Sequence, residues 1–106
     1  MSEIRIRQIE RRIERIKTAL SCVGPMRPGS LTQQYKDRNN KTGAYWQISY
    51  TRQMKSRTEY VRKEWLAEIR QQIANHKRFK RLVDQWIDLD IERSKLTMQI
   101  AEPKPT

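Results

Sequence analysis

The stretch that decides the fold is residues 44–61, AYWQISYTRQMKSRTEYV. Residues 44–51 alternate apolar or aromatic side chains with polar ones, which is the two-residue period of a half-buried strand. Residues 56–61 alternate in the same way, after a short polar connection at 52–55. The two runs predict a β-hairpin.

A third strand is expected, because a two-stranded ribbon is only marginally stable in water. Residues 30–35 are the candidate, and residues 37–43 join them to the hairpin through a segment rich in Asn and Gly, which suits a turn. We therefore predict a three-stranded antiparallel sheet within residues 30–61 that rests on a helix.

Helical patterns flank the sheet on both sides. Residues 3–22 place apolar side chains three and four residues apart, and the run GPMRPG at 24–29 then stops any helix. Residues 62–100 contain neither Gly nor Pro and predict a long helix, either straight or bent near residues 84–90. The prediction is an α+β fold, one domain over residues 1–106, with a flexible tail at 101–106.

The C-terminal half of the long helix is unusually apolar. If both helices meet the sheet at one end, the shorter one covers the longer one only as far as about Arg81. An exposed apolar patch of this size normally has a partner, so we predict a homodimer or a larger protein complex formed through Trp86, Ile87, Leu89, Ile91, Leu96 and Met98. The alternative is that a bend folds this half back onto the chain.

Charge is distributed unevenly along the chain. The formal net charge is +11, and residues 24–81 hold +10 of it, with fourteen Lys or Arg against four Asp or Glu. A surface that only confers solubility tends to mix the two signs. The uneven distribution therefore favours a surface that faces a polyanion, although a solvated surface without a partner remains open.

The sheet is the predicted nucleic-acid interface. If Trp46, Ile48, Tyr50 and Tyr60 face the helices, Gln47 lies on the opposite face with Arg57 beside it. These two are the candidates for contacting base edges in a major groove, Arg with guanine and Gln with adenine. The candidates for phosphate contacts near the sheet are Arg27, Lys36, Arg38, Lys41, Lys55, Arg62 and Lys63, and Arg52 at the tip of the hairpin is a further candidate for binding nucleic acid.

A basic cluster within the long helix has two equal interpretations. Lys77, Arg78, Lys80 and Arg81 occupy nearly successive positions, so they surround the helix. They either bind the phosphate backbone of a nucleic acid or form a solvated helical turn.

The chain also resembles a known family. The residues that carry the likeness are Gly29-Ser30-Leu31-Thr32 with Tyr35, Gly43-Ala44-Tyr45-Trp46 with Ser49-Tyr50, and Lys55-Ser56-Arg57 with Tyr60-Val61. They are similar to the core of a family of small bacterial proteins of unknown function, often found near mobile genetic elements. Many members carry a cysteine-rich insertion between the first two strands, and residues 36–42 here contain no Cys or His. The hairpin also resembles the arm-type DNA-binding domain of tyrosine recombinases.

The sequence gives no support for catalysis. His76 and Cys22 are each the only residue of their kind, and there is no Gly-rich phosphate loop. We therefore expect no enzyme activity, no cofactor and no metal. No apolar run is long enough for a membrane span, and a cytoplasmic protein is expected.

These observations predict a small basic protein that binds double-stranded DNA through a basic sheet face, within a mobile-element machine. Two alternatives stay open. One is an adaptor or inhibitor that binds a protein through the long helix, and the other is an RNA-binding subunit of a ribonucleoprotein.

Overall fold

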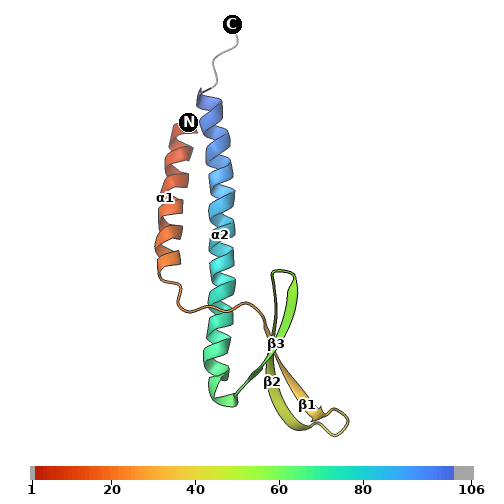
Figure 1. Cartoon of the computed structure of the whole chain (residues 1–106). Helices are drawn as coiled ribbons and strands as arrows, with labels where there is room; N and C mark the ends of the chain where they lie inside the picture. The colour runs from red at the N-terminus through yellow and green to blue at the C-terminus, as the bar shows by residue number, and fades with distance from the viewer. Residues whose placement is uncertain (1, 102–106) are drawn as a thin grey trace. The chain divides into compact units, whose positions relative to one another are not determined.

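A computed structural model describes residues 2–101 of the chain (Figure 1). An N-terminal helix, a three-stranded antiparallel sheet and a long C-terminal helix confirm the predicted α+β class. The elements are α1 (Ser2–Ser21), β1 (Ser30–Asp37), β2 (Thr42–Arg52), β3 (Lys55–Val61), a 3-10 turn η1 (Lys63–Trp65) and α2 (Leu66–Ala101).

The contacts divide the chain into two compact units. The sheet unit is Gly24–Lys77, and the helical unit combines Met1–Val23 with Arg78–Thr106. Each has its own hydrophobic cluster, and the two clusters share no residue. A single domain over the whole chain stays a prediction.

The sheet is a simple meander in the order β1-β2-β3, and both neighbouring pairs are antiparallel. Its core centres on Ile48 of β2, which is fully buried, and on Val61 of β3. Ile69, in the first turns of α2, completes the buried cluster. Leu31, Trp46, Leu66 and Ile73 pack around it. The alternation of side chains along β2 is what allows a single face to meet the helix.

The β2–β3 turn is tighter than the sequence indicates. Arg52 pairs with Lys55, so the loop is only Gln53 and Met54, not the four residues 52–55. Both loop residues have positive φ, 53° and 65°. Two-residue hairpin loops of this twist normally use Asn-Gly, because residues with a Cβ are disfavoured there. The turn is therefore strained, and it leaves Met54 99% exposed.

The linker between α1 and β1 is held against the start of α2. The amide of Arg27 donates a hydrogen bond to the Gln72 carbonyl at 3.0 Å, and the Asn75 side-chain amide donates to the Pro25 carbonyl at 2.8 Å. Gly29 then enters the sheet with φ +132°, a conformation that favours glycine.

The long helix begins later than predicted. Arg62 is extended, the turn Lys63–Trp65 follows, and α2 starts at Leu66. From there α2 is one α-helix of 36 residues to Ala101, so the alternative with a bend at residues 84–90 is wrong. Ala101 is helical, and the rest of the predicted tail lies outside the described residues. Between residues 2 and 101 no helix has the length and apolar character to cross a membrane.

In the helical unit, α1 runs antiparallel to the C-terminal half of α2. Its buried residues Ile9, Ile13 and Ile16 form a cluster with Leu89. Near the start of α1, the Arg5 guanidinium donates two hydrogen bonds to the Glu92 carboxylate, at 2.5 and 2.8 Å. This bidentate pair fixes the alignment of the two helices.

The prediction that α1 covers the long helix only as far as Arg81 is wrong. The linker contacts α2 at Gln72 and Asn75, and α1 packs on Leu82, Trp86, Leu89 and Leu96. Three of the six predicted interaction residues, Trp86, Leu89 and Leu96, therefore belong to the core of the chain itself. The other three, Ile87, Ile91 and Met98, remain 51%, 48% and 59% exposed.

Candidate nucleic-acid interface

The outward face of the sheet is polar and uncharged over most of its area. We call it the open face, and its side chains follow from the strand register: Ser30, Thr32, Gln34, Tyr45, Gln47, Ser49, Thr51, Ser56, Thr58 and Tyr60, with Lys36 at one end. Hydroxyls pair across β2 and β3, with 3.3 Å between the Ser49 and Thr58 oxygens and 3.2 Å between those of Thr51 and Ser56. The open face thus offers hydrogen-bonding groups without net charge.

The register corrects two predicted orientations. Tyr60 pairs with Gln47, so it lies on the open face and not toward the helices, and it is 68% exposed. Arg57 pairs with Tyr50, so it shares the helix-facing side of the sheet and does not lie beside Gln47. Of the two candidates for base contacts, only Gln47 is on the open face. The open face is therefore not basic, because its cations lie at the ends of the hairpins.

Arg27 is held in a network on the helix-facing side. Its guanidinium is ion-paired with Glu59 and lies 5.2 Å from the centre of the Tyr50 ring. The Tyr50 hydroxyl donates a hydrogen bond to the same carboxylate at 2.7 Å. This network ties the linker to β2 and β3, so we assign Arg27 a structural role in place of the predicted phosphate contact.

The same network makes the stability of the protein depend on pH. Hydrogen bonding from Arg27, and then from Tyr50, lowers the pKa of Glu59 below its ordinary value of 4.5. A carboxyl group whose pKa falls on folding contributes stability above its unfolded pKa, and this is lost as the pH drops through the folded pKa. For a pair this exposed the contribution is about 1 kcal/mol or less. Glu59→Gln should therefore be less stable than the parent at pH 7, and the difference should shrink on acidification below about pH 4.5.

Urea unfolding of both proteins at pH 7 and pH 3 measures this difference. If the parent and Glu59→Gln differed in free energy of unfolding by the same amount at both pH values, the Glu59 charge would not contribute to stability.

Six exposed cations lie at the two ends of the sheet. The β1–β2 hairpin carries Lys36, Arg38 and Lys41, and the β2–β3 hairpin carries Arg52, Lys55 and Arg57. In the first hairpin, the Asp37 carboxylate accepts hydrogen bonds from the amides of Asn39 and Asn40 at 3.1 and 3.2 Å, which orders the turn. Among residues 2–101, no ion pair involves any of these six cations. Each hairpin end therefore presents three exposed cations, and by the register Arg52 and Lys55 share the helix-facing side of the sheet with Arg57.

The remaining predicted contacts are not on the strands. Arg62 and Lys63 are exposed at the connection between β3 and α2, and Lys77, Arg78, Lys80 and Arg81 are exposed on α2 itself. Lys77 is the last residue of the sheet unit, whereas Arg78, Lys80 and Arg81 belong to the helical unit. The four side chains are distributed around the circumference of the helix, as predicted. Their positions favour neither a phosphate-binding cluster nor a solvated helical turn.

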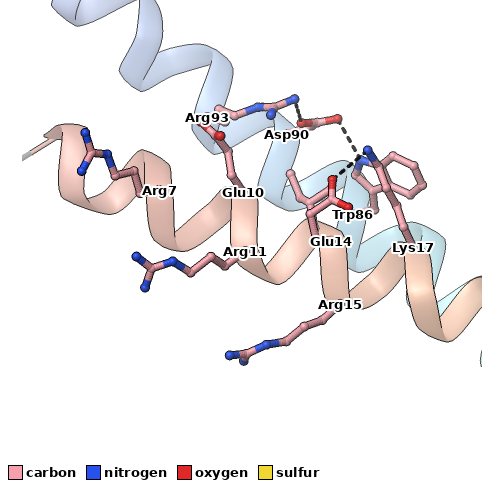
Figure 2. Close-up of a pocket in the computed structure, with 10 residues that line it drawn as sticks. Arg7, Glu10, Arg11, Glu14, Arg15, Lys17, Trp86, Asp90 and Arg93 are labelled. Carbon is pink, nitrogen blue, oxygen red and sulfur yellow. Dashed lines mark hydrogen bonds and ion pairs between the residues drawn. The ribbon is translucent and has the colours of Figure 1, made fainter.

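A row of arginines on α1 is not among the residues predicted to contact nucleic acid. Arg7, Arg11 and Arg15 recur every four residues, and the side chains of Arg11 and Arg15 point away from α2 (Figure 2). On the side toward α2, Lys17 pairs with Glu14 at 3.2 Å and lies 5.3 Å from the centre of the Trp86 ring. The signal that would have found the row is its regular spacing, which places the three side chains on one helical face.

Groups that could perform metal chemistry are not gathered in the described part of the chain. Within residues 2–101, no three His, Cys, Asp or Glu side chains are placed to hold a metal ion together. His76 is half-buried on α2, and Cys22 is exposed just after α1. The expectation that this protein is not an enzyme stays a prediction.

Comparison with known proteins places the chain in a family but gives no activity. No curated protein matches it, and no solved structure matches it. A family described as "Domain of unknown function (DUF6788)" matches residues 3–71, which include α1, the whole sheet and the first turns of α2. Because this match covers more than half of the 106 residues, the chain belongs to that family of unknown function.

Proposed function

We propose that this protein binds double-stranded DNA through the open face of the sheet, with the cations of the two hairpin ends on the phosphates. The observation that carries the proposal is that uncharged hydrogen-bonding side chains and cationic side chains occupy different positions along β2. The centre of the open face offers uncharged hydrogen-bonding groups, and the cations lie at the ends. Base edges need the first kind of group and phosphates need the second.

The dimensions of the sheet suit a major groove. Three strands spaced about 4.8 Å apart are about 10 Å across, and the groove of B-DNA is about 12 Å wide. The eleven residues of β2 extend about 34 Å, which is close to one helical repeat of DNA. The two groups of cations are thus far enough apart to reach phosphates at both ends of a groove segment.

Charge supplies the affinity in this arrangement. The sheet unit, Gly24–Lys77, has eleven Lys or Arg against four Asp or Glu, a net +7, and the helical unit holds the other +4 of the total of +11. Gln47 is the candidate for sequence recognition, because its amide can form two hydrogen bonds with adenine. Arg57 is reassigned from base contact to phosphate contact, and because it lies with Arg52 and Lys55 on the helix-facing side of the hairpin end, its long side chain has to reach a phosphate around the edge of the hairpin.

The test is binding to a random-sequence DNA duplex across a series of salt concentrations. Six phosphate contacts give a slope of about −5 for the logarithm of affinity against the logarithm of salt concentration. Replacing Lys36, Arg38 and Lys41 together with alanine should reduce the magnitude of this slope by about 3 and weaken binding at least tenfold at 0.1 M salt. Removing Arg52, Lys55 and Arg57 should have the same effect.

The chain offers a matched control in the arginine row of α1. Replacing Arg7, Arg11 and Arg15 with alanine removes the same charge from the helical unit, and we expect a much smaller change in slope. If this α1 variant lost as much affinity for DNA as the hairpin variants, the binding site would include α1. An absence of binding to any duplex at 0.1 M salt would contradict the proposal itself.

One observation favours a second candidate function, the recognition of unpaired RNA. Tyr45, two residues before Gln47 on β2, and Tyr60, opposite Gln47 on β3, both lie on the open face, and Tyr60 is 68% exposed. Aromatic rings on an open sheet stack on unpaired bases, with about 1–3 kcal/mol for each base. If this is the function, Tyr60→Leu should weaken binding to single-stranded RNA about fivefold or more and leave duplex binding unchanged. A place in a ribonucleoprotein or in a mobile-element machine stays a prediction.

A further inference from the structure

We infer that the helical unit forms a dimer in which the outer face of α2 packs against the same face of a second copy, running antiparallel. Beyond the seam that contacts α1, α2 has a second line of apolar side chains at Val83, Ile87, Ile91 and Met98, spaced four, four and seven residues apart. The first seam contains Leu82, Leu89 and Leu96, which face α1. On a helix of 3.6 residues per turn, the second line points in a different direction, and three of its four side chains, Ile87, Ile91 and Met98, are about half exposed or more.

A groove accompanies this second line. It has a volume of about 780 Å³, and its apolar walls come from Leu20 of α1 and from Phe79, Val83, Trp86, Ile87, Ile91 and Met98 of α2. Three of these side chains are about half exposed or more, namely Ile87, Ile91 and Met98. A groove of this shape between two helices fits a further helix, as in a four-helix bundle assembled from two helical hairpins.

The charges beside the groove identify the occupant. Asp88 and Lys95 are seven residues apart, so they lie on the same edge of the apolar line and carry opposite charges. In an antiparallel pair of identical helices, a register centred between residues 91 and 92 brings Asp88 opposite Lys95 of the second copy. Symmetry then repeats the contact on the other side. The face is therefore complementary to itself, which points to a second copy of this chain as its partner.

The first measurement is the mass of the full chain in solution. Sedimentation equilibrium at tens of micromolar should give about twice the 12.8 kDa of one chain. Ile87→Lys should shift the protein to the monomer, and the circular dichroism of the variant should show that its helices remain. A parent protein that stays monomeric at this concentration would overturn the inference.

The second measurement tests the antiparallel register by exchanging charges. Asp88→Lys places two positive charges together at both ends of the interface, and Lys95→Asp places two negative charges there. Each should raise the dissociation constant of the dimer about tenfold, and the double variant should restore it. Within one helix these residues are about 10 Å apart along the axis, so the rescue has to come from contact between copies.

Asp88 also lines a groove with Arg12 and Arg15 of α1, so Asp88→Lys alone changes contacts inside the chain as well. Lys95→Asp cannot repair such a contact, and a double variant that remains as weak as Asp88→Lys would therefore contradict the register. Asp84→Lys is the matched control, because it makes the same charge change one turn earlier, opposite Gln99 of the second copy, and should have little effect.

Disulfide trapping gives an independent check of direction. In a background in which the exposed Cys22 is replaced by serine, Ile91→Cys lies beside the symmetry axis and should form a disulfide-linked dimer under mild oxidation. Met98→Cys should not, because an antiparallel arrangement moves the two copies of residue 98 far apart. Equal crosslinking of both variants would indicate parallel helices and overturn the proposal.

Discussion

Replacing Ile48 with alanine should lower the free energy of unfolding of the sheet unit by about 3–4 kcal/mol. Ile48 is fully buried at the centre of β2, where it forms a cluster with Val61 and Ile69. Removing most of its side chain leaves a cavity that a small sheet with few buried residues is poorly able to close. Urea unfolding followed by circular dichroism measures the loss.

Ile9 of α1 is the matched position in the helical unit, because it is also fully buried. Ile9→Ala should have an effect of similar size, but on a different part of the chain. Hydrogen exchange should show that Ile48→Ala weakens amide protection in β2 and β3, whereas Ile9→Ala weakens it in α1 and the second half of α2. Equal loss of protection throughout the chain in both variants would show that the two units unfold as one domain.

Gly29→Ala should destabilise the sheet unit by about 2–3 kcal/mol or more. A Cβ at this position would lie 2.8 Å from the Ser49 carbonyl oxygen and 3.0 Å from Cγ1 of Ile48, on a backbone with φ +132°. The carbonyl belongs to the central strand, at the residue that pairs with Ser30, so it cannot move without disturbing the sheet. Thermal unfolding of the purified variant measures the loss.

Gly24→Ala is the control, because a Cβ there meets only the end of the Asn75 side chain, at 3.3 Å. We expect a change of less than about 1 kcal/mol in either direction, since alanine also restricts the unfolded chain. If both variants were equally stable, the close approach of Gly29 to β2 would not be important for the fold.

The kinds of element and their order follow from the sequence, because each depends on a local pattern. The spacing of Ile9, Ile13 and Ile16 predicts the buried face of α1, and the alternation around Ile48 predicts the buried face of β2; both predictions are confirmed. The partner of α1 could not be predicted in this way. The long helix has two apolar lines, and no local pattern says which of them α1 covers.

The orientation of β3 could not be predicted either, because the adjacent residues Tyr60 and Val61 are both candidates for its buried face. With two loop residues, even-numbered residues of β2 share a face with odd-numbered residues of β3. The predicted connection over residues 52–55 and the observed loop of Gln53 and Met54 give the same pairing of Thr51 with Ser56, so the loop length does not decide which face of β3 is buried. Gln53 and Met54 lack the Asn-Gly signature that identifies such a loop. Alternation alone does not say whether Tyr60 or Val61 is buried, and the register places Val61 opposite Trp46 and Tyr60 on the open face opposite Gln47.

The composition of the candidate site was easier to predict than its layout. The excess of positive charge in the central block is a property of the sequence alone, and the six hairpin cations are all among the predicted contacts. Their separation from the uncharged open face depends on the register of three strands, which no composition reveals. The engagement of Arg27 with Glu59 likewise depends on how the linker meets β3.

The position of the α1 core has a consequence for the design of shorter versions of this protein. The family match ends at residue 71, whereas the residues of α2 that cover α1 extend from Leu82 to Leu96. A fragment trimmed to the match would retain the isoleucines of α1 without the part of α2 that buries them, and most of the stability of an amphipathic helix in a protein comes from the packing of its apolar face. The minimal folding fragment that keeps α1 must therefore extend at least 25 residues beyond the family boundary, to Leu96.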